Sequence, residues 1–224
     1  TDSFNCMLDR INTLVNQVYQ QELAQKNAEI EALQAQINPH FLYNTLDSVN
    51  WMLIARGEMD ISAVVVALGK LMQYSMDTAR AMVSLEEEYR NVRDYLMIQK
   101  NRLEDRLEFT LELDEPLKCF PVPKLILQPL VENAIKYGIE PSLQPGHILV
   151  RTRKTDDDIQ ILVKDNGCGM DEAQLTFYRR LLRNDPSGQT NIGVRNVARR
   201  LQLHFGGRCG FNVSSRPGDG LSIT

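Results

Sequence analysis

The sequence has few of the residues that build metal sites and disulfide frameworks. Its 224 residues include four cysteines, which lie far apart and form no CxxC pair, and only three histidines. This scarcity argues against a zinc site, a disulfide framework or a His-rich metal site, and it fits a reducing compartment. The chemistry of each histidine, His40, His147 and His204, must therefore be judged from its own position.

A net positive charge and long apolar runs are also missing. The net charge is −4, without the clustered Lys and Arg of a nucleic-acid-binding surface, so we expect no nucleic-acid partner. This balance still permits ATP binding, because a few local cations and backbone N–H groups can hold phosphates. The longest apolar run, around residues 63–68, is far too short to span a bilayer.

Helical periodicity dominates the first half of the chain. Apolar residues recur at steps of three and four, which predicts one long helix over residues 1–57. The apolar seam shifts within residues 20–29, which indicates either a flexible joint between packed segments or a relay joint between signalling modules. The periodic pattern is present from the first residues, so we expect a fragment of a longer protein.

Gly57 and Asp60 interrupt the pattern, and a second helix is predicted over residues 61–101. Inside it, Ser84 and Glu87 have the spacing of a capping box, which predicts a kink and a restart of the helix. Two long helices joined by a short turn form an antiparallel hairpin. Because a lone hairpin buries little surface, we expect a homodimer in which two hairpins build a four-helix bundle.

The second half alternates between strand and helix patterns, which predicts an α+β domain with an open sheet covered by helices. Residues 166–190 are rich in Gly, Asp, Asn and Gln and are predicted as a long loop with one short helix. The predicted strands are residues 107–113, 148–153, 159–163, 211–213 and 221–223, and the predicted helices are residues 125–137 and 196–205.

Polar residues interrupt the apolar helix predicted over residues 125–137. Asn133 and Lys136 are three residues apart and share a helical face. An amide oxygen suits Mg²⁺ and an ammonium suits phosphate, although such residues also occur on the solvated side of a surface helix.

Two glycine-containing segments follow. Asp165 ends a predicted strand, and its carboxylate can accept a hydrogen bond from the exocyclic amine of a ligand. Gly167 and Gly169 permit the backbone to approach a ligand closely. Gly193 leads into a predicted helix, whose first N–H groups can hold phosphates. Taken singly, each segment is compatible with an ordinary turn.

Together, and in this order, the three segments resemble the ATP-binding domain shared by gyrase, Hsp90, MutL and histidine kinases (the GHKL, or Bergerat, fold). The matching boxes are Glu132–Lys136, Asp165–Met170 and Ile192–Val197. The resemblance implies that Asn133 holds Mg²⁺, that Asp165 reads adenine and that the loop between the last two boxes is a lid over ATP. It implies the following ATP-binding residues: Asn133, Lys136, Tyr137, Asp165, Gly167, Gly169, Met170, Gly193 and Val194.

The segment Gln36–Leu46 resembles the histidine box of LytS/YesM-type sensor histidine kinases, and residues 30–224 resemble that family as a whole. The resemblance implies autophosphorylation of His40 and transfer to an aspartate of a response regulator receiver domain. Ser3–Ile11 resembles the end of a HAMP domain, the relay module that follows a transmembrane helix. We therefore expect the cytoplasmic portion of a bacterial cell-membrane protein whose transmembrane region is missing here.

Within the histidine box, Pro39 predicts a kink beside His40. Asn44 lies four residues after His40 on the same helical face and is our candidate for orienting the imidazole. Phe41 stands where other histidine kinases carry an acid, so the base stays open, with Glu132 as the second candidate. Judged without the second half, His40 would be taken for a core histidine near a kink.

The expected domains are the end of a HAMP linker over residues 1–22, a dimerisation and phosphotransfer hairpin over residues 23–104, and an ATP-binding domain over residues 105–224. A non-catalytic, nucleotide-gated signalling scaffold is the alternative function. A serine kinase of the anti-sigma type shares the ATP domain, but it lacks the histidine hairpin.

Overall fold

The computed structural model describes residues 21–22, 25–26, 38–77, 79–155, 158–182 and 192–224. The chain divides into two compact units between Thr45 and Leu46. Most of the helix predicted over residues 1–37, with its seam shift and its HAMP-like start, lies outside the described residues. Among the described helices, none combines the length and the apolar character needed to cross a membrane.

The helix that carries His40, α2, spans Pro39–Ala55. The side chain of Asn38 accepts a hydrogen bond from the backbone N–H of Phe41 at 3.2 Å, as an N-cap residue does. Pro39 then occupies the first helical position, where its missing N–H and its fixed φ are favourable. Helix α2 therefore starts at Pro39, and the residues 27–37 that would precede the expected kink lie outside the described part of the chain.

The predicted break after α2 is confirmed. Gly57 adopts a φ of 77°, and α3 begins two residues later and spans Met59–Met76. The hydroxyl of Ser62 donates to the amide oxygen of Asn50 at 2.6 Å, which ties α3 to the second half of α2.

The prediction of one helix over residues 61–101 was wrong. After α3 the chain forms a short strand, β1 (Met82–Ser84), and then a separate helix, α4 (Leu85–Leu103). Strand β1 pairs antiparallel with β3 (Pro121–Pro123), a segment predicted to be loop. This pairing joins residues about forty positions apart, so local periodicity gave no sign of it.

The predicted capping box is confirmed at the start of α4. The hydroxyl of Ser84 accepts from the N–H of Glu87 at 3.2 Å, and the carboxylate of Glu87 accepts from the N–H of Ser84 at 2.9 Å. The box starts a new helix after a strand, whereas the sequence had predicted the restart of a kinked one.

The main sheet has the strand order β2-β4-β5-β7-β6. Strands β2 and β4 are parallel, and the other neighbouring pairs are antiparallel. All five strands were predicted, β2 from its alternation, although β6 begins two residues later than expected. Their bounds are Leu107–Leu113 for β2, Gly146–Lys154 for β4, Ile159–Asp165 for β5, Val213–Ser215 for β6 and Leu221–Ile223 for β7.

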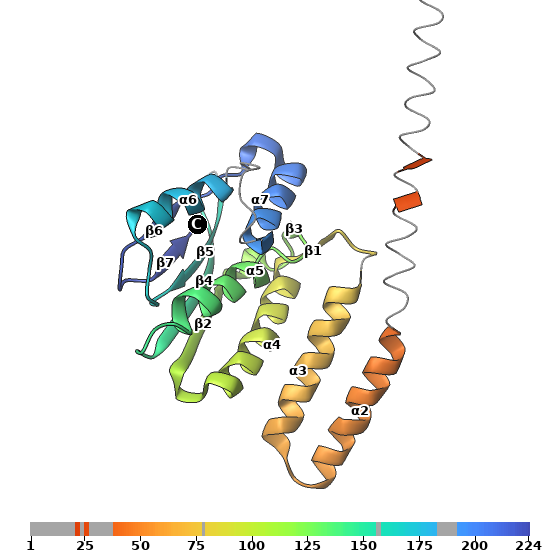
Figure 1. Cartoon of the computed structure of the whole chain (residues 1–224). Coiled ribbons are helices and arrows are strands. Elements are labelled where there is room, and N and C mark those ends of the chain that lie inside the picture. Colours follow the sequence, from red (N-terminus) through yellow and green to blue (C-terminus); the bar gives the residue numbers. More distant parts are fainter. Residues whose placement is uncertain (1–20, 23–24, 27–37, 78, 156–157, 183–191) are drawn as a thin grey trace, which may run out of the picture. The chain divides into compact units, whose positions relative to one another are not determined.

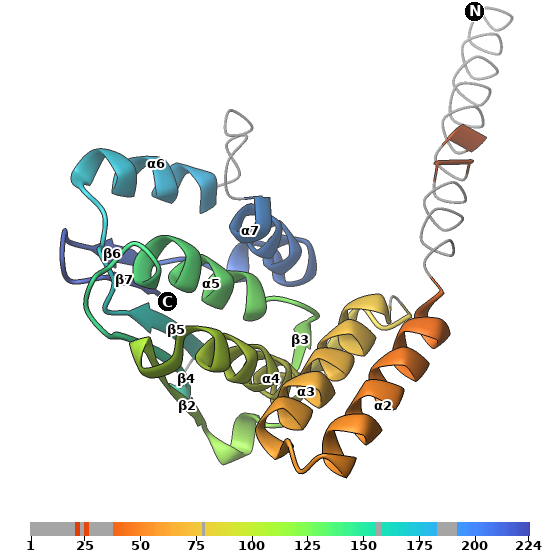
Figure 2. The ribbon, with the colours of Figure 1, turned by 60° about the horizontal axis from the view of Figure 1, so that its bottom comes forward.

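Helices cover one face of this sheet (Figures 1 and 2), which confirms the α+β class. They are α4, α5 (Gln128–Asn133) with its π-helical continuation (Ala134–Ile139), α6 (Glu172–Leu182) and α7 (Ile192–Phe205); short 3₁₀ turns span Glu104–Arg106, Glu115–Leu117 and Gly206–Arg208. The core lies between the two layers. Apolar side chains of α4 share it with the strands, for example Leu96 with Leu107 and Ile148.

Candidate functional site

Helix α5 places one amide in an otherwise apolar setting. Val131 and Ile135 are fully buried in the core, and Asn133 between them is 6% exposed. Among the described residues, the side chain of Asn133 has no hydrogen-bond partner. Its amide atoms are not among the fully buried atoms that lack a partner, and they line a pocket in which a ligand or an ion can contact them.

After Asn133 the α-helix widens into a π-helix, in which the N–H of Glu140 donates to the carbonyl of Ile135 at 2.9 Å. This geometry is often found at functional sites. The carbonyl of Gly138 accepts from the N–H of Cys168 at 3.0 Å. The wide turn is thereby joined to the glycine-rich loop that follows β5.

Two glycines make this close approach possible. A Cβ atom on Gly167 would lie 2.2 Å from the carbonyl carbon of Gly138, which no side chain tolerates. Gly169 adopts a φ of 67°, and a Cβ there would lie 1.9 Å from the carbonyl oxygen of Arg216. Both positions require glycine, as the motif predicted.

Asp165 stands at the end of β5 and is 2% exposed. Its Oδ1 accepts from the N–H groups of Gly167 at 2.9 Å and Leu221 at 3.3 Å. Burial raises the pKa of this carboxyl, and the two backbone donors partly offset that effect. Both of these bonds end on Oδ1, so Oδ2 is left as an acceptor for a ligand.

These groups enclose one small pocket. Five predicted site residues line it, together with two that the prediction omitted, Gly138 and Leu221: the predicted five are Asn133, Tyr137, Asp165, Gly169 and Met170. Gly138 directly follows the helix predicted over residues 125–137, and Leu221 follows a Gly-Asp-Gly turn. Neither local signal alone indicated that these two residues border the site.

Lys136 and the start of α7 lie outside the lining of this pocket. The ammonium of Lys136 is 5.1 Å from the ring centre of Tyr137, and within the described chain it has no acidic partner. Gly193 is in the first turn of α7, where a Cβ would be 3.3 Å from the Cβ of Pro129 in α5. Val194 is buried and anchors this end of the helix.

Glu132, the second candidate base, makes its side-chain hydrogen bond within α5. Its carboxylate accepts from the side-chain amide of Gln128 at 2.7 Å, and the oxygen of Gln128 accepts from Asn91 of α4 at 2.6 Å. Burial and, next, the charge of Glu132 raise the pKa of Tyr95, also in α4, to about 12. Glu132 is thus near α4 and is not among the residues that line the pocket.

His40 belongs to the unit that ends at Thr45, and its side chain is exposed. The amide nitrogen of Asn44 lies 3.2 Å from Nδ1 and 3.4 Å from Nε2 of the imidazole. The two side chains predicted to interact are therefore in contact. The role of this contact in orienting the ring stays a prediction.

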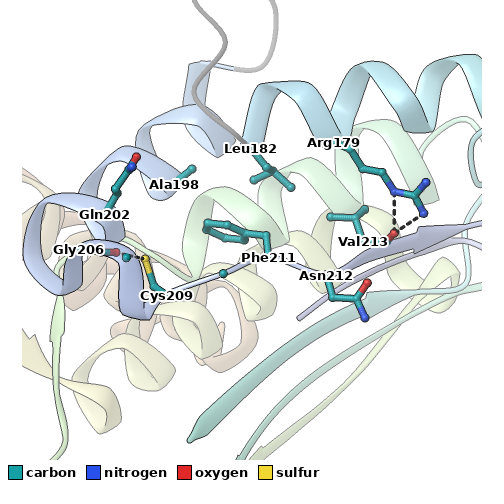
Figure 3. Close-up of a pocket in the computed structure, with 11 residues that line it drawn as sticks. Arg179, Leu182, Ala198, Gln202, Gly206, Cys209, Phe211, Asn212 and Val213 are labelled. Carbon is teal, nitrogen blue, oxygen red and sulfur yellow. Dashed lines mark hydrogen bonds between the residues drawn. The ribbon is translucent and has the colours of Figure 1, made fainter.

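A larger hollow of about 650 Å³ lies between α6, α7 and the segment that leads into β6 (Figure 3). Arg179 spans its edge and donates to the carbonyl of Val213 from Nε at 3.2 Å and from Nη2 at 2.9 Å. None of the residues predicted to act on a ligand lines this hollow. The small pocket around Asp165 is therefore the better candidate for chemistry.

Comparison with known proteins agrees with the motifs. The profile of the family described as histidine kinase matches residues 28–107, and that of histidine kinase-, DNA gyrase B- and HSP90-like ATPases matches residues 122–224. The chain is 41% identical over 220 residues to the sensor histidine kinase YesM of Bacillus subtilis (strain 168), covering 98% of this chain and 37% of that protein.

It is also 31% identical over 207 residues to an uncharacterized sensor-like histidine kinase of Staphylococcus epidermidis (strain ATCC 12228 / FDA PCI 1200), covering 92% of this chain and 40% of that protein. Among solved structures, a histidine kinase domain from a blue-light activated histidine kinase of Erythrobacter litoralis matches with a TM-score of 0.47 and 17% identity, covering 82% of this chain and 93% of the other. The chain thus spans about two fifths of the length of these curated relatives.

Proposed function

Because this chain belongs to the histidine kinase family, we propose that it phosphorylates His40 with ATP and passes the phosphoryl group to an aspartate of a response regulator. Nucleotide binding follows from the family of ATPases that residues 122–224 match. The observation that carries the proposal is the pocket in which the amide of Asn133 and the buried acid Asp165 line the same small space.

In this proposal Asp165 Oδ2 accepts a hydrogen bond from the exocyclic amine of adenine, and Tyr137 and Met170 contact the base. The amide oxygen of Asn133 binds Mg²⁺, a cation that prefers hard oxygen ligands and takes few of them from the protein. The Asn133 side chain fits this role because it is buried, faces the pocket and is unpartnered among the described residues. Bound Mg²⁺ neutralises charge on the phosphates.

The phosphates need further donors, and two elements are suited to supply them. Lys136 places its ammonium over the ring of the pocket residue Tyr137, and within the described residues it forms no ion pair. Gly193 and Val194 lie in the first turn of α7, where backbone N–H groups have no partner within the helix and the helix dipole favours an anion. The lid expected between the last two motifs falls partly on residues outside the described chain.

Transfer requires the imidazole to present a lone pair in line with the γ-phosphate. An asparagine amide can offer either its N–H or its oxygen to a ring nitrogen. We propose that Asn44 accepts from Nδ1–H, which leaves the Nε2 lone pair to attack phosphorus. The bond to the bridging oxygen breaks, ADP leaves, and the Nδ1 proton passes to water, which reaches the exposed ring. This contact favours Asn44 as the orienting group, and Glu132 remains only a candidate base.

The exposed apolar side chains of the hairpin support a homodimer. Trp51 is 70% exposed and Met52 61%, an unusual density of large apolar surface for a monomer. A second hairpin that covers these side chains would complete a four-helix bundle. The apolar residues concerned are Val49, Trp51, Met52, Ile54, Met59, Ile61, Val66 and Leu68.

The division into domains also stays a proposal. We assign residues 1–22 to the end of a HAMP linker, 23–104 to the histidine hairpin and 105–224 to the ATP-binding domain. Helix α4 bears on the boundary between residues 104 and 105. It falls in the proposed hairpin domain, yet its apolar side chains belong to the core that the sheet shares. We further propose that the complete protein is held at the bacterial cell membrane by a segment outside this sequence.

Incubation of the chain with γ-labelled ATP and magnesium tests the proposal. We expect acid-labile, base-stable label on the wild type, because phosphohistidine is a phosphoramidate, and no label on His40→Gln. The loss should exceed about a hundredfold, since the substitution removes the nucleophile. The matched control is His204→Gln, an exposed histidine at the end of α7, which should label as the wild type does.

Label that survives acid and resides on serine would support a serine kinase instead. Nucleotide binding without any label would support the non-catalytic scaffold.

A further inference from the structure

Glu88 forms a junction of three elements. This carboxylate, in the first turns of α4, is fully buried. It accepts from three successive backbone N–H groups, those of Leu125, Ile126 and Leu127, at 2.7, 2.8 and 2.9 Å. It also accepts from the hydroxyl of Tyr74, in α3, at 2.5 Å. Four donors compensate the burial of one charge.

The three backbone donors lead directly into α5, the helix that carries Asn133. Leu125 adopts a φ of 60°, a left-handed conformation that costs a branched residue free energy. The hydrogen bond from its N–H to Glu88 holds it there. The position of the first turn of α5 therefore depends on the position of Glu88.

The same segment receives contacts from both sides. Arg200 of α7 donates to the carbonyl of Lys124 at 2.6 Å. The ammonium of Lys124 donates to the carbonyl of Asp77 just after α3, and it lies 4.6 Å from the ring centre of Tyr74. Residues 124–127 are thus where the hairpin helix α3 meets the two helices that carry the proposed nucleotide groups.

The bond from Tyr74 differs from the others in what it connects. The three N–H groups already satisfy the Glu88 carboxylate locally, whereas the phenol adds a link to the hairpin. Burial, followed by the charge of Glu88, raises the pKa of Tyr74, so the phenol stays protonated as a donor at any working pH. This link is therefore a constant feature of the folded chain.

We infer that Tyr74 and Glu88 are positioning residues for phosphoryl transfer, and that their hydrogen bond couples the hairpin helix α3 to the entry of the nucleotide-binding helix α5. The inference rests on the proposed function, because it assigns a role in phosphoryl transfer to the hydrogen bond between α3 and α4. Neither residue touches the nucleotide in this account. Coupling of this kind is reciprocal, so nucleotide bound at α5 must alter the stability of α3.

The test compares Tyr74→Phe with Tyr89→Phe in the full chain. Tyr89 is the matched control: it also loses a buried hydroxyl, but that hydroxyl bonds Thr152 at 2.7 Å and the carbonyl of Glu112 at 2.9 Å, both in the sheet. We measure amide hydrogen exchange with and without a non-hydrolysable ATP analogue and magnesium, and the labelling rate of His40 at saturating ATP.

In the wild type and in Tyr89→Phe, the analogue should change exchange in both the α5 entry and the last turns of α3. In Tyr74→Phe the change in α3 should disappear, while affinity for the analogue stays within about twofold. Because a hydrogen bond to a charged group is lost, the labelling rate should fall about tenfold. Glu88→Gln should lose the same change in α3 and should also weaken nucleotide binding, because its amide NH₂ faces backbone donors of the α5 entry. The double variant should lose little more of the labelling rate than Glu88→Gln alone.

Retention of the nucleotide-dependent change in α3 by a folded Tyr74→Phe chain would overturn the inference. So would an equal loss of rate in Tyr89→Phe, because the effect would then be one of general stability. Absence of nucleotide binding in the wild type would instead overturn the proposed function itself, so the two failures are distinguishable.

Discussion

Replacement of Asp165 by asparagine is expected to lower the affinity for ATP by about ten- to a hundredfold while the chain keeps its fold. The asparagine oxygen can still accept from the N–H groups of Gly167 and Leu221, which Oδ1 of Asp165 now bonds. Its NH₂ group then replaces Oδ2 and faces the amine of adenine, donor against donor. Loss of a hydrogen bond to a charged group costs about 1.5–3 kcal/mol, which corresponds to this range of affinity.

Calorimetric titration with a non-hydrolysable ATP analogue measures this change, and circular dichroism checks the fold. Asp171→Asn is the control, because Asp171 is an exposed acid that caps α6 by accepting from the N–H of Gln174 at 2.8 Å. Asparagine caps helices equally well, so nucleotide affinity should not change. Wild-type affinity in a folded Asp165→Asn chain would show that this acid does not bind the nucleotide.

Replacement of Gly167 by alanine should abolish nucleotide binding and lower the thermal stability. The added Cβ would lie 2.2 Å from the carbonyl carbon of Gly138 and 2.3 Å from its oxygen, and backbone on both sides leaves no flexible group to give way. Overpacking in a close-packed region costs about 1–3 kcal/mol or more. The shift would also displace the N–H that now donates to Asp165.

Thermal unfolding followed by nucleotide titration measures both effects. The matched control is Gly207→Ala, since a Cβ at Gly207 meets no atom within 4 Å. If Gly167→Ala bound nucleotide as tightly as the control, the close approach of the two backbones would have no part in the site.

Elements fixed by local periodicity were predictable from the sequence. The alternation in Leu107–Leu113 identified β2, and the Ser84 and Glu87 pair identified the start of α4. Both signals lie within a few residues of the structure they specify. The break between α3 and α4 was missed because β1 is fixed by its pairing with β3, far along the chain.

Strand β3 shows why local chemistry misled the prediction. Pro121 and Pro123 lack a backbone N–H donor, which indicated a loop. Because β3 is an edge strand in a two-stranded sheet, it can contain proline at positions that donate no hydrogen bond to the neighbouring strand. Glu132 was named as a candidate base from its motif, and that role stays a prediction. Its hydrogen bond with Gln128, which in turn bonds Asn91 of α4, becomes apparent only in three dimensions.

The candidate site was predicted more fully than the fold around it. Asn133, Asp165 and Gly169 meet in one pocket although they come from a helix, a strand end and a loop. Spacing alone did not predict this convergence; the order of the three motifs and their resemblance to a known domain did. The role of Gly138 could not be inferred without seeing that Gly167 packs against it.

The central claim is that the pocket at Asn133 and Asp165 holds a magnesium-chelated nucleotide. Calorimetric titration of the intact, folded wild-type chain with an ATP analogue tests it most directly, once with magnesium and once with a chelator. We predict saturable uptake of about one nucleotide per chain, substantially weaker when magnesium is withheld. No uptake with magnesium present, by a chain shown to be folded, would contradict the account.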